Sequence, residues 1–158
     1  VQATLFHWSP QVMYRWRAFL LRIFGAKIGK NVVIRPSVKI TYPWKLTLGD
    51  YVWVGDDAVL YTLGNITIGA HAVISQKSYL CTGSHDYASQ HFDISASPIM
   101  IGEKCWLATD VFVAPGVTIG DGTVVGARSS VFKSLPANAI CRGNPAVVTR
   151  KRVENVTP

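Results

Sequence analysis

One histidine stands where it could act as a catalyst. His85 ends the segment Cys81-Thr-Gly-Ser-His85, and the next residues, 86–97, lose the regular aliphatic spacing seen on either side of them. A neutral imidazole can take a proton from a hydroxyl near neutral pH, so His85 is a candidate general base. Spacing alone leaves a second interpretation open, because a histidine at a corner of a fold is more often surface decoration than a base.

The three cysteines, Cys81, Cys105 and Cys141, indicate neither a disulfide framework nor a metal site. Their number is odd and their spacing matches no metal-binding pattern. We expect small buried side chains with reduced thiols, as in cytoplasmic proteins, rather than thiol nucleophiles. His71 and His85 lie fourteen residues apart, so we expect them at different corners, where they cannot share one ion. The sequence therefore predicts no metal.

The charge distribution favours an anionic partner. The net charge is +7, and no acidic residue precedes Asp50. The basic residues form two clusters, one before Asp50 (Arg15, Arg17, Arg22, Lys27, Lys30, Arg35, Lys39 and Lys45) and one near the C-terminus (Arg142, Arg150, Lys151 and Arg152). A phosphorylated cofactor or a lipid surface would suit such clusters, and plain solvated surface is the alternative. We expect no nucleic-acid partner, because the chain has no recognised binding motif and no regular aromatic platform.

An aliphatic residue returns every six positions through most of the chain. All fifteen residues that open these hexads are Ile, Leu or Val: Ile28, Ile34, Ile40, Leu48, Val54, Leu60, Ile68, Ile74, Leu80, Ile101, Leu107, Val113, Ile119, Val125 and Val131. A period of six is typical of a coil of short strands that each bury one large side chain. Three hexads close one triangular coil, so the pattern predicts an all-β parallel solenoid of about five coils.

Two further positions of the hexads support this prediction. The fourth residue after the aliphatic one is usually small and is expected to point inward, as at Val32, Val38, Ala58, Ala72, Ser78, Ser84, Thr123 and Ser129, with Trp44 and Leu135 as exceptions. A glycine often follows the aliphatic residue, as at Gly29, Gly49, Gly55, Gly69, Gly102, Gly120 and Gly126. We expect these glycines to supply the permissive backbone of a tight corner.

The sequence predicts one domain with capped ends. Residues 1–27 form a lead-in with a helix over residues 10–24, which begins at Ser9-Pro10 and ends at Gly25. The helix has one apolar stripe (Val12, Trp16, Phe19, Leu20, Ile23 and Phe24) and is expected to cap the open end of the solenoid, with a helix on a membrane surface as the alternative. Residues 28–136 form the solenoid, residues 86–97 a projecting loop and residues 137–158 a C-terminal tail. No apolar stretch is long enough to span a membrane. The odd number of cysteines without metal spacing favours reduced thiols, so we expect a cytoplasmic protein.

These features together resemble one known family. The hexads, the motif from Thr82 to His85 with its loop, Cys105-Trp106 in the next coil and the tail Gly143-Asn144-Pro145-Ala146 are similar to the hexapeptide-repeat acyltransferases, which fold as left-handed parallel β-helices. The runs LGDYVWVGDDAVLYTLGNITIG and SYLCTGSHDY make the likeness greatest to the O-acetyltransferases of bacterial exopolysaccharide synthesis, of the colanic acid type. The resemblance covers nearly the whole chain and supplies the left-handed winding, which the residues alone do not.

The resemblance implies a homotrimeric enzyme that uses acetyl-CoA. His85 matches the family's base, which deprotonates an acceptor hydroxyl for direct attack on the acetyl thioester. The coenzyme contacts would fall near Trp106, Ala108, Thr109, Ala127, Lys133, Pro145, Arg150 and Lys151, with Lys133 and Arg150 on the phosphates. Asp57 and Asp86, expected near His85, are candidates for binding the hydroxyls of a sugar acceptor or for orienting the imidazole.

Two points stay open at this level. Sugar acetyltransferases of the maltose and galactoside type carry asparagine near the position of Gly55 to Asp57, and this chain does not, so the resemblance does not fix the saccharide or lipid-linked saccharide acceptor. The alternative to an enzyme is a β-helix scaffold or a protein that binds anionic surfaces without turnover. Peripheral contact with the inner face of a membrane through the basic N-terminus is compatible with both.

Overall fold

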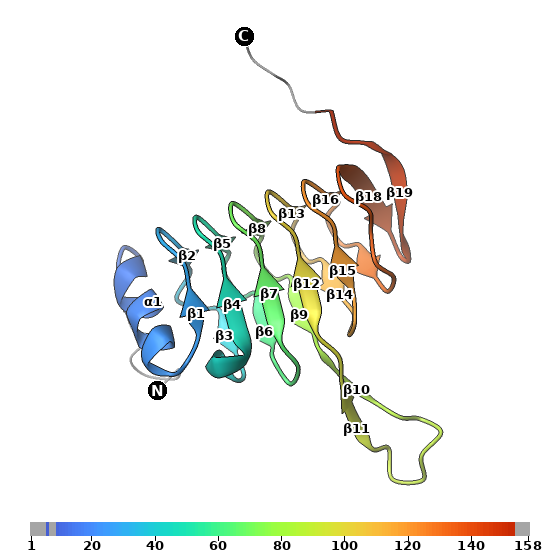
Figure 1. Ribbon diagram of the computed structural model, residues 1–158, viewed down its shortest axis with the longest axis horizontal. Helices are drawn as coiled ribbons and strands as arrows, with labels where there is room; N and C mark the ends of the chain where they lie inside the picture. Colours follow the sequence, from blue (N-terminus) through green and yellow to red (C-terminus); the bar gives the residue numbers. More distant parts are fainter. Residues whose placement is uncertain (1–5, 7–8, 154–158) are drawn as a thin grey trace.

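The chain winds as a triangular solenoid in the computed structural model, which describes Phe6 and residues 9–153 (Figure 1). Three walls, here called sheets A, B and C, follow one another in each turn. Sheet A contains β1 (Lys27–Ile28), β4 (Leu46–Leu48), β7 (Ile66–Ile68), β12 (Ile99–Ile101) and β15 (Thr118–Ile119). Sheet B contains β2 (Val33–Ile34), β5 (Trp53–Val54), β8 (Val73–Ile74), β13 (Trp106–Leu107), β16 (Val124–Val125), β18 (Ala139–Gly143) and the antiparallel β19 (Ala146–Lys151). Sheet C contains β3 (Lys39–Ile40), β6 (Val59–Tyr61), β9 (Tyr79–Cys81), β14 (Phe112–Val113) and β17 (Ser130–Val131).

The six-residue rhythm marks the core, as predicted. Of the fifteen hexad-opening residues all are buried except Ile28, which is half-buried in the first strand. They stack from coil to coil, since Ile34 pairs with Val54, Val54 with Ile74 and Ile74 with Leu107. Each coil therefore shields the apolar side chains of the next, and burying one such side chain stabilises the fold by about 1.5–3 kcal/mol.

The prediction of five coils is one too low. After five complete turns, Leu135 bridges to Ile119 of sheet A and β18 joins sheet B, which makes about six turns. The hexad rhythm ends at Val131, and the last turn is instead filled by Leu135, Ala139 and Cys141, which are buried at other spacings. Parts of the predicted lead-in and tail lie outside the described residues. These parts are residues 1–5, 7–8 and 154–158.

The glycines serve a different purpose from the one predicted. The left-handed backbone falls two residues later, for example at Tyr51 (φ 58°) after Gly49 and at His71 (φ 58°) after Gly69. The glycines themselves lie where adjacent coils almost touch. A Cβ on Gly69 would come within 2.6 Å of the backbone nitrogen of Glu103 one coil further on. The hexad glycine is therefore needed for close approach between coils.

We expect Gly69→Ala to lower the free energy of unfolding by about 1–3 kcal/mol, because the added methyl forces two backbone segments apart. Urea denaturation followed by circular dichroism measures the loss. The matched control is Thr118→Ala on the exposed side of sheet A, where an effect within about 0.5 kcal/mol is expected. An unchanged midpoint for Gly69→Ala would show that the coils can separate without cost.

The helix α1 (Tyr14–Ile23) lies across the N-terminal end of the solenoid and contacts β1 and β2 (Figure 1). It begins four residues later than predicted, at an N-cap Met13 that makes no side-chain capping bond. Ser9, the predicted cap, is instead buried, and its Oγ donates to the carbonyl of Phe6 at 2.6 Å. Within the described part of the chain, no helix has the length and apolar character needed to cross a bilayer.

The predicted apolar stripe of the helix does not face the solenoid. Leu20 is buried, but Phe19 and Ile23 are exposed, and the inward face is completed by Arg17. The Arg17 guanidinium, fully buried, donates to the carbonyls of Ile34 (2.6 Å), Pro10 (3.0 Å) and Gln11 (2.7 Å) and to the Oγ of Ser9 (2.8 Å). Burial lowers the pKa of Arg17. This cation therefore holds the cap to the first coil and is not available to a partner.

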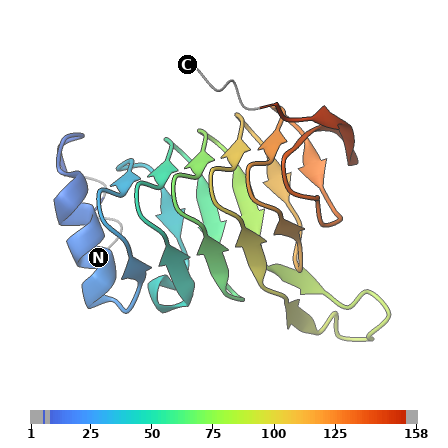
Figure 2. The same ribbon diagram turned by 45° about the horizontal axis from the view of Figure 1, so that its top comes forward.

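After Thr82 the chain leaves the solenoid as an antiparallel ribbon of β10 (Gly83–His85) and β11 (Ile94–Ala96) (Figure 2). The ribbon begins earlier than residue 86, because Gly83 already pairs with Ala96. Ser84 is therefore exposed, although the hexad pattern predicts an inward position, while the other seven predicted inward residues are buried.

Candidate active site

His85 lies on the projecting ribbon, paired with Ile94 and exposed to solvent. Its Nδ1 is 2.6 Å from the carbonyl oxygen of Phe92 on the opposite arm. A carbonyl oxygen only accepts hydrogen bonds, so this contact places the ring proton on Nδ1 and leaves Nε2 with a free lone pair. An imidazole held in this tautomer can accept a proton at Nε2.

Thr82, the first residue of the motif that ends at His85, anchors the base of the ribbon. The Thr82 side chain is buried, donates to the carbonyl of Tyr61 at 2.5 Å and accepts the N–H of Gly64 at 2.8 Å. Its carbonyl accepts the N–H of Ser97 at 2.9 Å, where the chain returns. Both arms are thus tied to the previous coil at one point, which fixes where His85 emerges.

The turns between the sheets form three columns along the solenoid. We name them corner AB, corner BC and corner CA after the sheets that they join. The ribbon with His85 leaves from corner CA, between β9 and β12, whereas His71 lies at corner AB and stacks on Tyr51 at 4.9 Å between ring centroids. The prediction that the two histidines occupy different corners is confirmed. Among the described residues no group of three or more His, Cys, Asp or Glu side chains is placed to hold a metal ion.

The two candidate acceptor residues lie in different places. Asp86 directly follows His85 in the ribbon, and its Oδ1 accepts the N–H of Ala88 at 2.9 Å, so part of its carboxylate shapes the turn. Asp57 lies at corner BC with a left-handed backbone (φ 58°), two residues before the start of β6 and one wall away from corner CA. Within one chain the structure therefore does not place Asp57 near His85, contrary to the expectation from the sequence.

Four of the predicted coenzyme residues share corner BC. Ala108 and Thr109 lie in one turn, Ala127 in the next, and Pro145 in the loop between β18 and β19 beyond it. The exposed Trp106 leans toward the same corner, since its Nε1 donates to the Oγ of Ser75 at 3.0 Å. These residues therefore form a column at the C-terminal half of the solenoid.

Two cations beside this column were not among the predicted site residues. Arg142 lies over Gly126, where an added Cβ would come within 3.1 Å of the Arg142 Cβ. Arg128 lies in the same turn as Ala127, and its Nε is 3.7 Å from the Oδ2 of Asp110. The sequence does contain a signal for Arg142, which stands immediately before the tail motif Gly143-Asn144-Pro145-Ala146.

The three predicted phosphate-binding cations do not join the column. Lys133 follows β17 at corner CA, in the same column of turns as the His85 ribbon. Arg150 and Lys151 pair with Ile140 and Ala139 at the start of β18, next to corner AB. The candidate residues are therefore divided between corners, with His85 and Lys133 at one edge of sheet C and Thr109, Ala127 and Pro145 at the other.

Comparison with known proteins identifies the family. Residues 98–133 match the model for the bacterial transferase hexapeptide (six repeats). The chain is 88% identical over 154 residues to the colanic acid biosynthesis acetyltransferase WcaF of Escherichia coli strain K12, an alignment that covers 98% of this chain and 85% of WcaF. The chain belongs to the hexapeptide-repeat acyltransferase family. The galactoside O-acetyltransferase of the same strain is 29% identical over 85% of this chain and 68% of its own length.

Solved structures of hexapeptide-repeat acyltransferases have the same fold. A maltose O-acetyltransferase from Clostridium difficile 630 superposes with a TM-score of 0.89 at 27% identity, covering 97% of this chain and 83% of its own. A galactoside acetyltransferase in complex with coenzyme A gives a TM-score of 0.87 at 27% identity, with 95% and 76% coverage. A Vibrio cholerae acetyltransferase complexed with acetyl coenzyme A gives 0.84 at 26% identity, with 89% and 78% coverage. This hexapeptide-repeat acyltransferase is thus an acetyltransferase.

The cysteines of this hexapeptide-repeat acyltransferase are poorly suited to nucleophilic catalysis. Cys105 and Cys141 are buried, and burial raises the pKa of both thiols, so the thiolate form is disfavoured at neutral pH. The Sγ of Cys105 also lies 3.1 Å from the carbonyl of Gly120. Cys81 is half-buried, with its Sγ 3.2 Å from the carbonyl of Gly83. The exposed His85 is the better candidate for chemistry.

Proposed function

We propose that this acetyltransferase moves an acetyl group from acetyl-CoA to a hydroxyl of a sugar or lipid-linked saccharide in exopolysaccharide synthesis, with His85 as the general base. Acetyl-CoA as the donor is supported by the acetyl coenzyme A complex of the Vibrio cholerae relative and the coenzyme A complex of the galactoside acetyltransferase. A saccharide acceptor is supported by 88% identity to WcaF, whose name assigns it to colanic acid biosynthesis. The observation that carries the proposal for His85 is its 2.6 Å contact with Phe92, which leaves Nε2 free.

The proposed reaction needs no covalent intermediate on the enzyme. Nε2 of His85 takes the proton of the acceptor hydroxyl while the hydroxyl oxygen attacks the carbonyl carbon of the thioester. Backbone N–H groups stabilise the oxyanion of the tetrahedral intermediate, whose collapse breaks the carbon–sulfur bond. The leaving CoA thiolate takes the proton back from the imidazolium. The products are the acetyl ester and free CoA, and His85 is again neutral.

In this proposal the active site lies between two copies of the chain. His85 and Lys133 lie at corner CA, whereas Trp106, Thr109, Ala127 and Pro145 lie at or lean toward corner BC, across the width of sheet C. Corner BC of one chain against corner CA of its neighbour would unite them around one coenzyme. The same contact would bring Asp57 of the neighbour toward the ribbon as an acceptor-binding residue, with Asp86 adjacent to the base. Three copies related by a threefold axis would close the ring with three equivalent sites.

Free thiol release tests the proposed activity. The purified chain is mixed with acetyl-CoA and a panel of mono- and oligosaccharides, and thiol formation is followed alongside mass spectrometry of the sugar. We expect thiol release that depends on a saccharide, with one acetyl group added per CoA released. If no saccharide is acetylated and thiol release equals that of the blank, the proposed saccharide acceptor is wrong.

Neutralising Lys133 at corner CA together with Arg128 and Arg142 beside corner BC is expected to raise KM for acetyl-CoA about tenfold or more while changing kcat little, because contacts to remote phosphates act as uniform binding. The matched control removes three other exposed cations in the N-terminal half, Lys27→Gln, Lys30→Gln and Lys39→Gln, and should leave KM unchanged. Steady-state kinetics with acetyl-CoA and its dephospho analogue make the measurement. Equal KM values for the triple variant and the wild type would assign these cations another role.

A further inference from the structure

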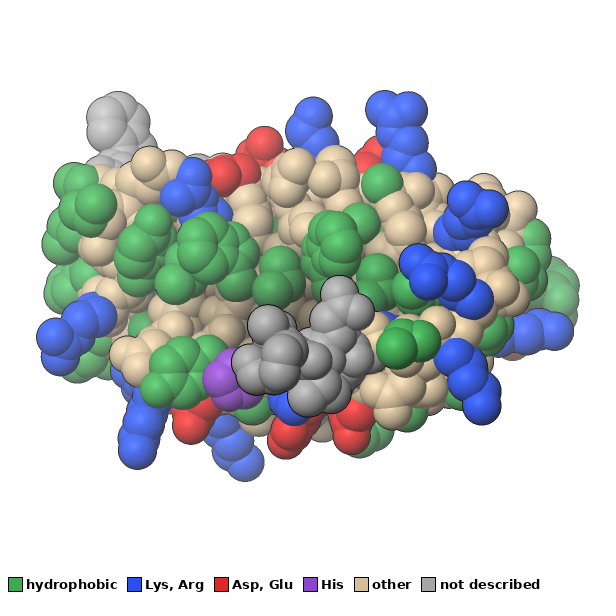
Figure 3. Space-filling model, turned by 90° about the horizontal axis from the view of Figure 1, so that it is seen from above, with side chains coloured by type: hydrophobic (Ala, Val, Ile, Leu, Met, Phe, Trp, Pro, Cys, Tyr) green, Lys and Arg blue, Asp and Glu red, His purple; other side chains and the backbone are tan. Residues whose placement is uncertain are grey.

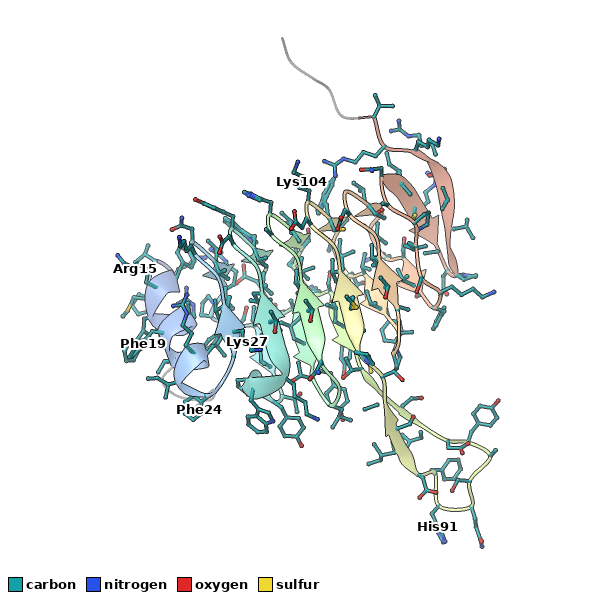
Figure 4. All side chains as sticks on the ribbon, viewed as in Figure 1. Arg15, Phe19, Phe24, Lys27, His91 and Lys104 are labelled. Atoms are coloured by element: carbon teal, nitrogen blue, oxygen red, sulfur yellow. The ribbon has the colours of Figure 1, made fainter. Side chains whose placement is uncertain are left out.

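The outer face of the capping helix exposes large apolar side chains that contribute nothing to the core. Phe19 is 50% exposed and Ile23 61%, while Leu20 and Leu21 on the inner face are buried. Val12, just before the helix, and Phe24, just after it, are exposed as well. Phe19 points away from the solenoid in Figure 4. In the view from above, hydrophobic side chains gather at the left end of the molecule, where α1 lies (Figure 3). A concentration of exposed apolar side chains on one face indicates a surface that contacts a protein or a membrane.

Four exposed cations lie on the helix and on the coil that it caps. They are Arg15 and Arg22 on the helix and Lys27 and Lys30 on the first coil, and Arg15 points outward beside Phe19 in Figure 4. None of the described residues before Asp50 is acidic. Among the described residues, the Arg22 side chain donates to the carbonyls of Ile28 and Gly29, which orient it without neutralising its charge. The face therefore combines exposed apolar groups with uncompensated positive charge.

An open groove runs between the helix and the first coil. Its volume is about 870 Å³, and its lining includes the side chains of Trp16 and Phe19 together with Arg15, Arg22 and Lys30. The closest carboxylate in sequence, Asp50, is already bound, because its Oδ1 accepts the N–H of Lys30 at 2.7 Å. Cationic heads beside aromatic rings suit the phosphates of lipid headgroups, while the rings enter the boundary of the acyl chains.

We propose that the outer face of α1, with the cations of the first coil, binds the surface of an anionic lipid bilayer. Binding places the helix in the plane of the interface, with Phe19 and Ile23 inserted and Arg15, Lys27 and Lys30 against the headgroups. A second copy of the same face is a poor occupant, because two surfaces that each carry four cations would repel one another. Charge complementarity therefore selects the anionic bilayer.

This docking would set the orientation of the whole enzyme. The helix caps one end of the solenoid, so binding through its outer face presents the end of the solenoid, not a wall, to the membrane (Figure 1). The walls and the ribbon stay free for the proposed reaction. Copies of the chain arranged with parallel solenoid axes would bring their helices to the same side, and simultaneous contacts strengthen attachment. The inference does not rest on the reaction, since bilayer binding is measured without acetyl-CoA.

Sedimentation with vesicles tests the proposal on the full chain. Vesicles of phosphatidylcholine alone are compared with vesicles of phosphatidylcholine mixed with phosphatidylglycerol, at low and at high salt. We expect binding to the anionic vesicles that weakens as salt screens the cations. The variant Arg15→Gln/Lys27→Gln/Lys30→Gln should weaken binding by roughly 100-fold, because each cation near an anionic surface contributes about fivefold. Phe19→Ser/Ile23→Ser should also weaken binding, including at low salt.

A control variant carries one change of each kind elsewhere. Tyr87→Ser/Lys104→Gln removes one exposed aromatic and one exposed cation far from the helix and should bind like the wild type. Circular dichroism checks that every variant has the wild-type melting curve. Equal binding of wild type to neutral and anionic vesicles, or undiminished binding by both helix variants, would overturn the proposal. A lower apparent mass of Phe19→Ser/Ile23→Ser without vesicle binding by the wild type would overturn it too, by assigning the face to a protein contact.

Discussion

Replacing His85 with alanine is expected to lower kcat by about two to four orders of magnitude, the usual contribution of a positioned general base. The loss should appear in kcat more than in KM, because the proton is transferred only as the thioester is attacked. The side chain is exposed and its one described hydrogen bond is to Phe92, so the fold and the melting temperature should stay unchanged. Thiol release at saturating acetyl-CoA gives the rate.

The chain provides a close control for this experiment. His91 lies in the same ribbon, is also exposed, and only its backbone N–H makes a described hydrogen bond, to the Oγ of Ser89 at 3.3 Å. His91→Ala should therefore retain wild-type turnover. If His85→Ala keeps near-normal kcat, or if both variants lose activity equally, His85 is not the base and the ribbon contributes only its shape.

The fold was predictable because burial repeats in the sequence. One aliphatic side chain must fill each wall of each coil, so Val54, Ile74 and Leu107 recur at the same phase and pair directly with one another. The sixth turn was hidden because Leu135 and Cys141 fill it at other spacings. The predicted number of coils is therefore too low because the six-residue spacing ends before the last turn.

Two features of the cap and the ribbon could not be predicted from periodicity. Arg17 faces inward because carbonyls far apart in sequence, such as those of Ile34 and Pro10, converge on it, and no local pattern encodes that convergence. Ser84 has the size and position of an inward residue, but the pairing of Gly83 with Ala96 pulls it out of the coil. In both cases contacts with residues distant in the sequence, rather than local spacing, determine whether the side chain is buried.

The sequence predicts which corner of the solenoid carries each histidine, but not which candidate residues come together in one site. Counting along the hexads separates His71 from His85 correctly, because each hexad advances the chain by one wall. The same counting places Asp57 one wall away from the ribbon. The structure shows in addition that Thr109 and Ala127 lie at the opposite edge of sheet C from His85. If His85 and the residues at corner BC serve one active site, as proposed, a second chain must supply half of it.

We therefore expect a C3 homotrimer of about 52 kDa, three times the 17.3 kDa of one chain, that loses its activity when it dissociates. Sedimentation equilibrium across the assay concentrations, with activity measured on the same samples, makes the comparison. Turnover per chain should fall together with the trimer fraction. A fully active monomer would contradict both the assembly and the placement of the site between chains.

Mixed trimers give the sharper test of a shared site. Ala127→Trp blocks corner BC at an exposed position, and His85→Ala removes the base at corner CA, so each homotrimer should be inactive. In trimers reassembled from equal amounts of the two variants, a site is intact when its base comes from an Ala127→Trp chain and its corner BC from a His85→Ala chain. Random assembly produces that arrangement at about a quarter of the sites, so about a quarter of wild-type activity should return. A site built within one chain would recover nothing, because every chain in the mixture lacks one of its two halves.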